Sequence, residues 1–111
     1  MADLDLRSLT CVKKEDQSGR DEVSLFIDGV KVFGPEKMSN GDEIAIPVGN
    51  HPIPAVPGSV LVELLEVGGG NPVQLGAVVV PDFLPGNHDY FGVFDDELPG
   101  AFYFMKYRVI P

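Results

Sequence analysis

The 111-residue chain has one cysteine, two histidines and no tryptophan, and these shortages exclude several kinds of site. A lone Cys11 cannot form an intramolecular disulfide. A structural zinc site needs four ligands drawn mainly from Cys and His, and Cys11 is far along the chain from His51 and His88. Because Cys11 lies within the apolar stretch 9–12, we expect its thiol to be buried and unreactive.

Basic residues are also scarce, with 8 Lys and Arg against 17 Asp and Glu and a net charge of −9. A surface this negative repels phosphate backbones, so nucleic acid is not an expected partner. It also repels anionic lipid, so we expect membrane binding only if calcium mediates it. Two interpretations of the charge stay open: it keeps the domain soluble, or some of the carboxylates converge on a metal ion.

Long hydrophobic runs are missing, since no apolar stretch approaches the roughly 20 residues of a membrane span. Residues 1–6 alternate acids with leucines and lack the basic and apolar regions of a signal peptide. We therefore expect a cytoplasmic protein, with export by a route that needs no signal as the alternative. The length is that of one domain, so we expect a single domain over residues 1–111.

What the chain does have is a period-two alternation of apolar and polar residues, together with 13 Gly and 10 Pro that mark many turns. This pattern is typical of strands. The expected strands are residues 4–11, 23–27, 30–33, 44–46, 59–67, 73–80, 90–94 and 102–110. The sequence therefore predicts an all-β fold, a single antiparallel β-sandwich of about eight strands.

Turn residues indicate how these strands connect. Asp28-Gly29 between two apolar runs predicts a two-residue hairpin. Pro35 lies in the stretch 34–40, which we expect to be a connection because proline cannot donate to a ladder. The four prolines of residues 47–57 predict an irregular or edge segment. A change in the phase of alternation near residues 7–8 predicts a bulge.

Acidic residues concentrate in three connections. Residues 13–22 carry four carboxylates around Gly19, and calcium binds six to eight oxygens from groups of this kind. The alternative is a solvated hairpin whose acids pair with its own basic residues. Further acidic stretches are residues 82–89 and 95–97. Alternate connections of a sandwich lie at the same end, so the connection 13–22 can meet some of these acidic stretches.

The closing segment, residues 102–108, is aromatic and basic. We expect its aromatic side chains to fill the core of a fold without tryptophan, and the alternative is an exposed aromatic face for a sugar or a protein. None of the serines lies in a nucleophile-elbow context, and the glycine run 68–70 does not open a helix that would bind phosphate. The chain is therefore not expected to be an enzyme.

The order of these pieces resembles the small bacterial C2-like β-sandwich domains. The matching residues are Leu9-Thr10-Cys11, Glu15-Asp16, Gly19-Arg20-Asp21-Glu22, Leu25, Asp28-Gly29, Val32, Met38, Gly41-Asp42, Val62-Glu63-Leu64, Tyr103, Tyr107 and Val109. The resemblance implies an eight-stranded sandwich, and many such domains bind calcium through Asp-rich loops at one end and dock on lipid or protein. It makes Asp16, Asp21 and Glu22 the candidate calcium ligands. Where these domains tend to have a second acidic motif, this chain has Leu65-Glu66-Val67-Gly68-Gly69, which puts the metal in doubt.

The first hypothesis is thus a non-enzymatic C2-like binding module, with calcium as its candidate cofactor, that mediates protein or surface interaction. The second is a metal-free protein-interaction domain, such as an inhibitor, immunity or accessory protein, whose negative charge steers it to a basic partner. The third is a small hydrolase or a carbohydrate-binding sandwich.

Overall fold

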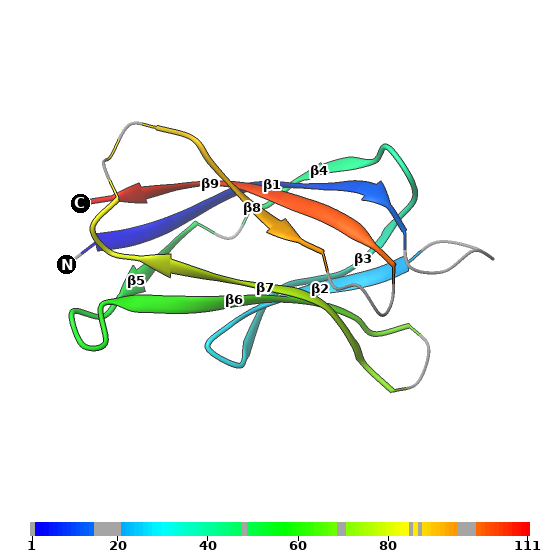
Figure 1. Ribbon diagram of the computed structural model, residues 1–111, viewed down its shortest axis with the longest axis horizontal. Coiled ribbons are helices and arrows are strands. Elements are labelled where there is room, and N and C mark those ends of the chain that lie inside the picture. The colour runs from blue at the N-terminus through cyan, green and yellow to red at the C-terminus, as the bar shows by residue number, and fades with distance from the viewer. Residues whose placement is uncertain are drawn as a thin grey trace.

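Two antiparallel sheets face each other in the computed structural model, which describes residues 2–14, 21–47, 49–68, 71–84, 86, 88–95 and 100–111 (Figure 1). The strands within these ranges are β1 (Ala2–Lys13), β2 (Asp21–Ile27), β3 (Val30–Met38), β4 (Glu43–Ala45), β5 (Asn50–Ile53), β6 (Ser59–Glu66), β7 (Val73–Pro81), β8 (Tyr90–Phe94) and β9 (Phe102–Ile110). The all-β sandwich is confirmed, with one strand more than expected. No helix that could span a membrane occurs in the described part of the chain.

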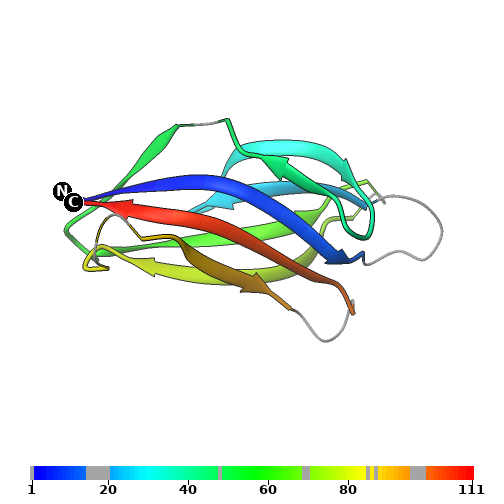
Figure 2. The same ribbon diagram turned by 90° about the horizontal axis from the view of Figure 1, so that it is seen from above.

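The first sheet has the order β4-β1-β9-β8, and β5 pairs with β1 beyond the end of β4. The second sheet has the order β3-β2-β6-β7. Seen from above, β8 lies over β7 along one side of the sandwich, and β4 and β5 lie along the other side (Figure 2). Each sheet therefore has two outermost strands, one on each side of the molecule.

The hairpin predicted at Asp28-Gly29 is confirmed. The two residues connect β2 to β3 with φ values of 49° and 83°. Positive φ at both central residues is the turn geometry that matches the twist of paired strands, and glycine adopts it without steric cost. The backbone N–H of Leu61 also donates to Asp28 Oδ1 at 2.9 Å, which fixes the turn against β6.

The prediction that Pro35 ends the ladder is wrong, because β3 continues through it to Met38. Glu36, Lys37 and Met38 still pair with β2, after register shifts around Leu25. Proline is tolerated on an outermost strand, where its missing N–H faces away from the sheet, and bulges absorb the irregular backbone. Whether Pro35 interrupts the ladder thus depends on the position of β3 at the edge of its sheet, and a local sequence pattern does not show that position.

The additional strand, β5, lies in the proline-rich segment 47–57 that was expected to be irregular or an edge. Its four residues pair with Ala2–Asp5 of β1, so the edge alternative holds for this part of the segment. Pro52 again lies on an outermost strand. The other eight strands overlap the expected ranges.

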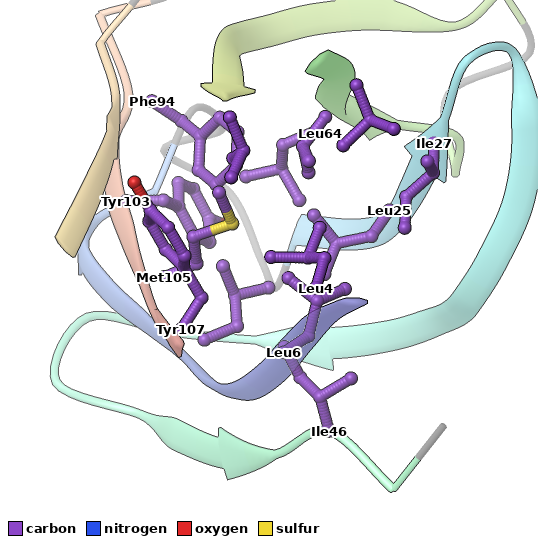
Figure 3. Packing of buried hydrophobic residues seen from close by; sticks show 14 of the residues in the cluster. Leu4, Leu6, Leu25, Ile27, Ile46, Leu64, Phe94, Tyr103, Met105 and Tyr107 are labelled. Atoms are coloured by element: carbon purple, nitrogen blue, oxygen red, sulfur yellow. The ribbon is translucent and has the colours of Figure 1, made fainter. Parts of the chain in front are cut away.

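The core lies between the two sheets and follows the predicted alternation (Figure 3). Val60, Val62 and Leu64 of β6 are buried. On β1 the buried phase changes after Leu6, where the register with β9 shifts, and this confirms the bulge predicted near residues 7–8. Large fully buried side chains from both sheets include Leu4, Leu6, Leu25, Leu64, Leu75, Phe94, Tyr103 and Met105.

Two glycines allow the sheets to approach on the side where β8 lies over β7. A Cβ atom on Gly76 of β7 would lie 2.5 Å from the Cα atom of Phe94 in β8. A Cβ atom on Gly92 of β8 would lie 2.8 Å from the Met105 side chain and 3.1 Å from that of Val78. Close backbone approach of this kind is a recognised use of glycine in strands. It brings the outermost strands of the two sheets into contact along this side.

Candidate functional site

The three acidic connections do not all lie at one end of the sandwich. The ends of β1, β3, β6 and β8 that lead into connections are at the end opposite the two termini (Figure 1). Asp21, Glu22, Glu66 and Asp95 are therefore at this end, which we call the acidic end. Residues 82–89 connect β7 to β8 at the end near the termini (Figure 1). The strands that flank residues 13–22 and 95–97 thus end or begin on the same side of the molecule, and contact between the acids of these two connections stays a prediction.

Asp21 opens β2 and is fully buried. The Tyr103 hydroxyl donates to Asp21 Oδ2 at 2.5 Å, across the space between the two sheets. Burial, and then the hydrogen bond to Asp21, raise the pKa of the Tyr103 phenol above its usual value, so the phenol stays a donor. One oxygen of this candidate calcium ligand is thus engaged in the core.

Cys11 lies beside this pair and is fully buried, as predicted. Burial raises the pKa of its thiol, the hydrogen bond with Tyr103 lowers it, and the negative charge of Asp21 raises it again. The net direction is upward, which favours the neutral thiol. A thiolate is the reactive form of cysteine, so this position does not support a nucleophile.

Glu22 and Glu66 meet where β2 and β6 end. The buried carboxylate of Glu66 accepts the backbone N–H of Glu22 at 2.9 Å and that of Gly68 at 2.5 Å. The backbone N–H of Val67 donates in turn to the carbonyl of Glu22 at 2.8 Å. This network holds the end of β6 against the start of β2. Glu66 was not among the predicted site residues, although it follows Val60, Val62 and Leu64 in the buried phase of β6.

The structure brings Asp21 and Glu22 to one strand end but turns them apart. Successive residues of a strand point to opposite faces, and Asp21 is buried whereas Glu22 is half-buried. Within the described ranges, no group of three or more His, Cys, Asp or Glu side chains could hold a metal ion. Asp16, the third candidate ligand, lies outside the described residues, so the site of Asp16, Asp21 and Glu22 stays a prediction.

The aromatic side chains divide between the core and the surface. Phe94, Tyr103, Met105 and Tyr107 are buried, as expected for a core without tryptophan. Phe91 and Val93 of β8, which alternate with buried residues, are 61% and 47% exposed. The core interpretation is therefore confirmed for the inner face of the sheet. The outer face carries exposed apolar side chains, and a sugar or protein that binds them stays a prediction.

Together with the half-buried Phe102 and Phe104 of β9, these two exposed residues, Phe91 and Val93, line a shallow hollow of about 240 Å³ on the outer face of β8 and β9. We call these four residues the aromatic patch. The rings of Phe91 and Phe104 pack edge to face, with centroids 5.8 Å apart. Val93 is paired directly with Phe104 in the register of the two strands. Cross-strand pairs of this kind give the patch a fixed shape.

Charged residues surround the aromatic patch. Asp95 follows β8 directly and is exposed, and Asp96 and Glu97 come next in the sequence. At the other end of β8, Asp89 Oδ1 lies 2.6 Å from Arg108 Nε, and this hydrogen bond lowers the pKa of the Asp89 carboxyl. Lys106 is paired with Phe91. The described rim therefore carries both signs of charge, while the chain as a whole carries −9, which suits a partner that is apolar and basic.

Comparison with known proteins gives a likeness in fold. A solved structure of a C2 domain superposes on this chain with a TM-score of 0.56 and 11% sequence identity, covering 99% of this chain and 97% of that one. No family model and no curated protein matches the chain. The likeness extends over both sheets, and the fold is therefore C2-like.

Proposed function

We propose, from the C2-like fold and the aromatic patch, that this chain is a non-enzymatic binding module that recognises a protein partner through the patch. The observation that carries the proposal is the gathering of Phe91, Val93, Phe102 and Phe104 on one outer face. Contiguous exposed apolar surface is rare on proteins that act alone, and aromatic residues are enriched at the centres of interfaces. The net charge of −9 favours a partner with a basic rim.

The lining of the hollow favours a protein over a sugar. All four lining side chains, Phe91, Val93, Phe102 and Phe104, are hydrocarbon. A sugar site needs polar groups that bond the hydroxyls, because a buried hydroxyl without a partner is costly. An apolar side chain of a protein partner has no such requirement, so the carbohydrate alternative has less support.

The test compares two patch variants with a matched control elsewhere on the surface. Phe91→Ser and Phe104→Ser each remove one ring from the patch. Val56→Ser removes an apolar side chain that is 88% exposed in the turn before β6. The full chain and its variants are immobilised, and proteins captured from an extract of the source cells are identified by mass spectrometry.

We expect a partner that the wild type and the Val56→Ser variant capture and that both patch variants lose. Binding of that partner, once purified, weakens as salt is raised, because the charges at the rim are screened. Capture of the same proteins by all four chains, or of none, contradicts the proposal. Circular dichroism of each variant checks that the fold is kept.

Calcium binding at the acidic end is the second candidate function. It is supported by the position of Asp21, Glu22 and Asp95, which two different connections bring to one end of the sandwich (Figure 1). Asp16, Asp96 and Glu97 belong to the same two connections in the sequence. Calcium binds oxygen ligands of this kind and would offset the repulsion between them.

The test is the thermal midpoint of unfolding in millimolar CaCl₂ and in millimolar MgCl₂. A ligand at about 100 times its dissociation constant stabilises the native state by about 2.7 kcal/mol, which raises the midpoint by several degrees. We expect a rise in CaCl₂ that is lost in Asp16→Asn and Glu22→Gln. No rise in the wild type removes calcium and leaves the aromatic patch as the proposed binding site.

A further inference from the structure

The outermost strands on the two sides of the sandwich differ in their residues. On one side, β3 carries Pro35 together with Lys31, Glu36 and Lys37, while β4 has three residues and β5 contains Pro52. Charges, prolines and short length are the devices that prevent another strand from pairing at an edge. This side is protected against strand addition.

On the other side, β7 and β8 have fewer of these devices. Their sequences are VQLGAVVVP and YFGVF, without a charged residue and with proline only at the last position of β7. Val79 of β7 and Phe91 and Val93 of β8 are among the exposed large apolar residues of the described chain. A natural protein that leaves such an edge unprotected exposes itself to aggregation unless a partner uses the edge.

β8 is the edge that adjoins the aromatic patch. Among the described strands it pairs only with β9, through Tyr90–Phe94. In an antiparallel ladder, alternate residues direct both N–H and C=O away from the neighbouring strand, so β8 presents main-chain groups on its other side. A strand added there would place alternate side chains on the outer face, in contact with Phe91 and Val93.

The charges at the two ends of β8 indicate which residues the added strand contains. Asp89 precedes β8 and Asp95 follows it. A second copy of this chain would be a poor occupant. Antiparallel pairing of two copies about Gly92 sets Asp89 of each opposite Asp95 of the other, and each copy carries a net charge of −9. The net charges of two copies repel each other, whereas a basic residue beside Asp95 complements its charge. Asp89 is already bonded to Arg108 at 2.6 Å.

We infer that an extended segment of the partner pairs with the edge of β8 that faces away from β9, with apolar residues at alternate positions on the aromatic patch and a basic residue at the end beside Asp95. This inference rests on the proposed function and specifies the partner. Recognition by strand addition draws affinity from main-chain hydrogen bonds and specificity from alternate side chains.

The probe is a peptide selected from a random library displayed on phage, with the full chain as the target. The most enriched peptide is synthesised with its natural backbone and in two N-methylated forms, each methylated at every second amide. One form loses the donors that face β8, and the other loses donors that face solvent. We expect alternating apolar residues with a basic residue at one end, and a loss of affinity of about tenfold or more in one methylated form only.

Protein variants identify the edge and the occupant. Val93→Lys introduces a charge on β8, and Val79→Lys introduces the same charge on β7 as the matched control. We expect the peptide to lose binding to the Val93→Lys and Phe91→Ser variants and to keep binding to the Val79→Lys variant. Amide exchange of β8, followed by NMR, slows when the peptide binds.

Other outcomes contradict the inference in distinguishable ways. Equal binding of both methylated peptides, with loss only in Phe91→Ser, keeps the proposed function and removes strand addition. Loss in Val79→Lys alone moves the pairing to β7 and overturns the assignment of β8. A dimer of the chain that competes with the peptide makes a second copy the occupant and overturns it as well. Selection of no peptide, or of peptides without alternation, also overturns it.

Discussion

Tyr103 and Asp21 form a polar contact inside an otherwise apolar core. The Tyr103 hydroxyl donates to the buried Asp21 carboxylate, and Cys11 lies beside both. A hydrogen bond to a buried charged group is among the stronger ones, and removal of its donor leaves the charge less well solvated. This contact joins β2 of one sheet to β9 of the other, so it stabilises the sandwich at the acidic end.

The variant Tyr103→Phe should lower the free energy of unfolding by about 1–3 kcal/mol, because Asp21 loses a donor. Urea denaturation at pH 7 measures this change. Tyr107→Phe is the matched control, since Tyr107 is a buried tyrosine of the same strand whose ring stacks on that of Tyr90, with centroids 5.8 Å apart. An equal loss in both variants would mean that the Asp21 contact contributes nothing specific.

The same contact predicts a loss of stability in alkali. The pKa of Tyr103 is raised in the folded state above its ordinary value of 10.0. A group with a raised folded pKa contributes stability that is complete below the unfolded pKa and falls as pH rises above it. Unfolding of the wild type should therefore become easier above about pH 10, and this slope should be smaller in Tyr103→Phe.

Asp89 gives the opposite dependence on pH at the other end of the molecule. Its hydrogen bond from Arg108 lowers the carboxyl pKa below the ordinary value of 3.8. The stabilisation is present above the unfolded pKa and is lost as pH falls through the lower, folded pKa. The thermal midpoint of Asp89→Asn should lie slightly below that of the wild type at pH 7, and the difference should disappear near pH 2. A difference that persists in acid would exclude the charge as its cause.

At the scale of the strands, the network around Glu66 explains how the acidic end is held. Its carboxylate accepts two backbone N–H groups, those of Glu22 and Gly68. Glu66→Gln replaces one acceptor oxygen with an NH₂ group that faces a donor, so we expect a loss of about 1–3 kcal/mol in urea denaturation. Glu63→Gln, on the outer face of the same strand, should change stability by less than about 0.5 kcal/mol. Equal effects would mean that this network does not support the strand ends.

The strands show which features of the fold are visible in the sequence. Alternation predicted the buried faces of β6 and β9, and Asp28-Gly29 predicted its hairpin, because these features depend on neighbours in the chain. The continuation of β3 through Pro35 was missed because it depends on the position of β3 at the edge of its sheet. Glu66 had a local signal, a charged residue in a buried phase, that was not used.

The candidate site was less predictable than the fold. Asp21 and Glu22 were singled out as ligands, yet their adjacency in a strand already implies opposite faces. The aromatic patch depends on which strand lies beside β9, and only the order of the sheet places Phe91 and Val93 next to Phe102 and Phe104. Contacts between residues far apart in the sequence therefore account for what the sequence did not show.

At the scale of the whole molecule, net charge and exposed apolar surface have opposite effects on self-association. At pH 7 the charge of −9 opposes the association of copies through β7, β8 and the aromatic patch. This repulsion vanishes near the isoelectric point of about 4.4. We expect the wild type to self-associate as the pH falls from 8 towards 4.4, as followed by dynamic light scattering.

The comparison that identifies the surface responsible uses the same added charge at two places. Val93→Lys should reduce the association, whereas Val56→Lys, in the turn before β6, should not. If both variants associate as the wild type does, the unprotected side of the sandwich is not the surface that self-associates.

The one-sided protection of the sheets also limits how large any assembly can grow. A filament needs each subunit to have two interaction surfaces, one that binds the previous subunit and one that binds the next. Here the side formed by β3, β4 and β5 is protected against strand pairing. A subunit whose β8 pairs with a neighbour therefore has no second edge on the opposite side at which a further subunit could pair. Pairing through strand edges would therefore end after one subunit has been added, so the exposed edge of β8 does not lead to a filament.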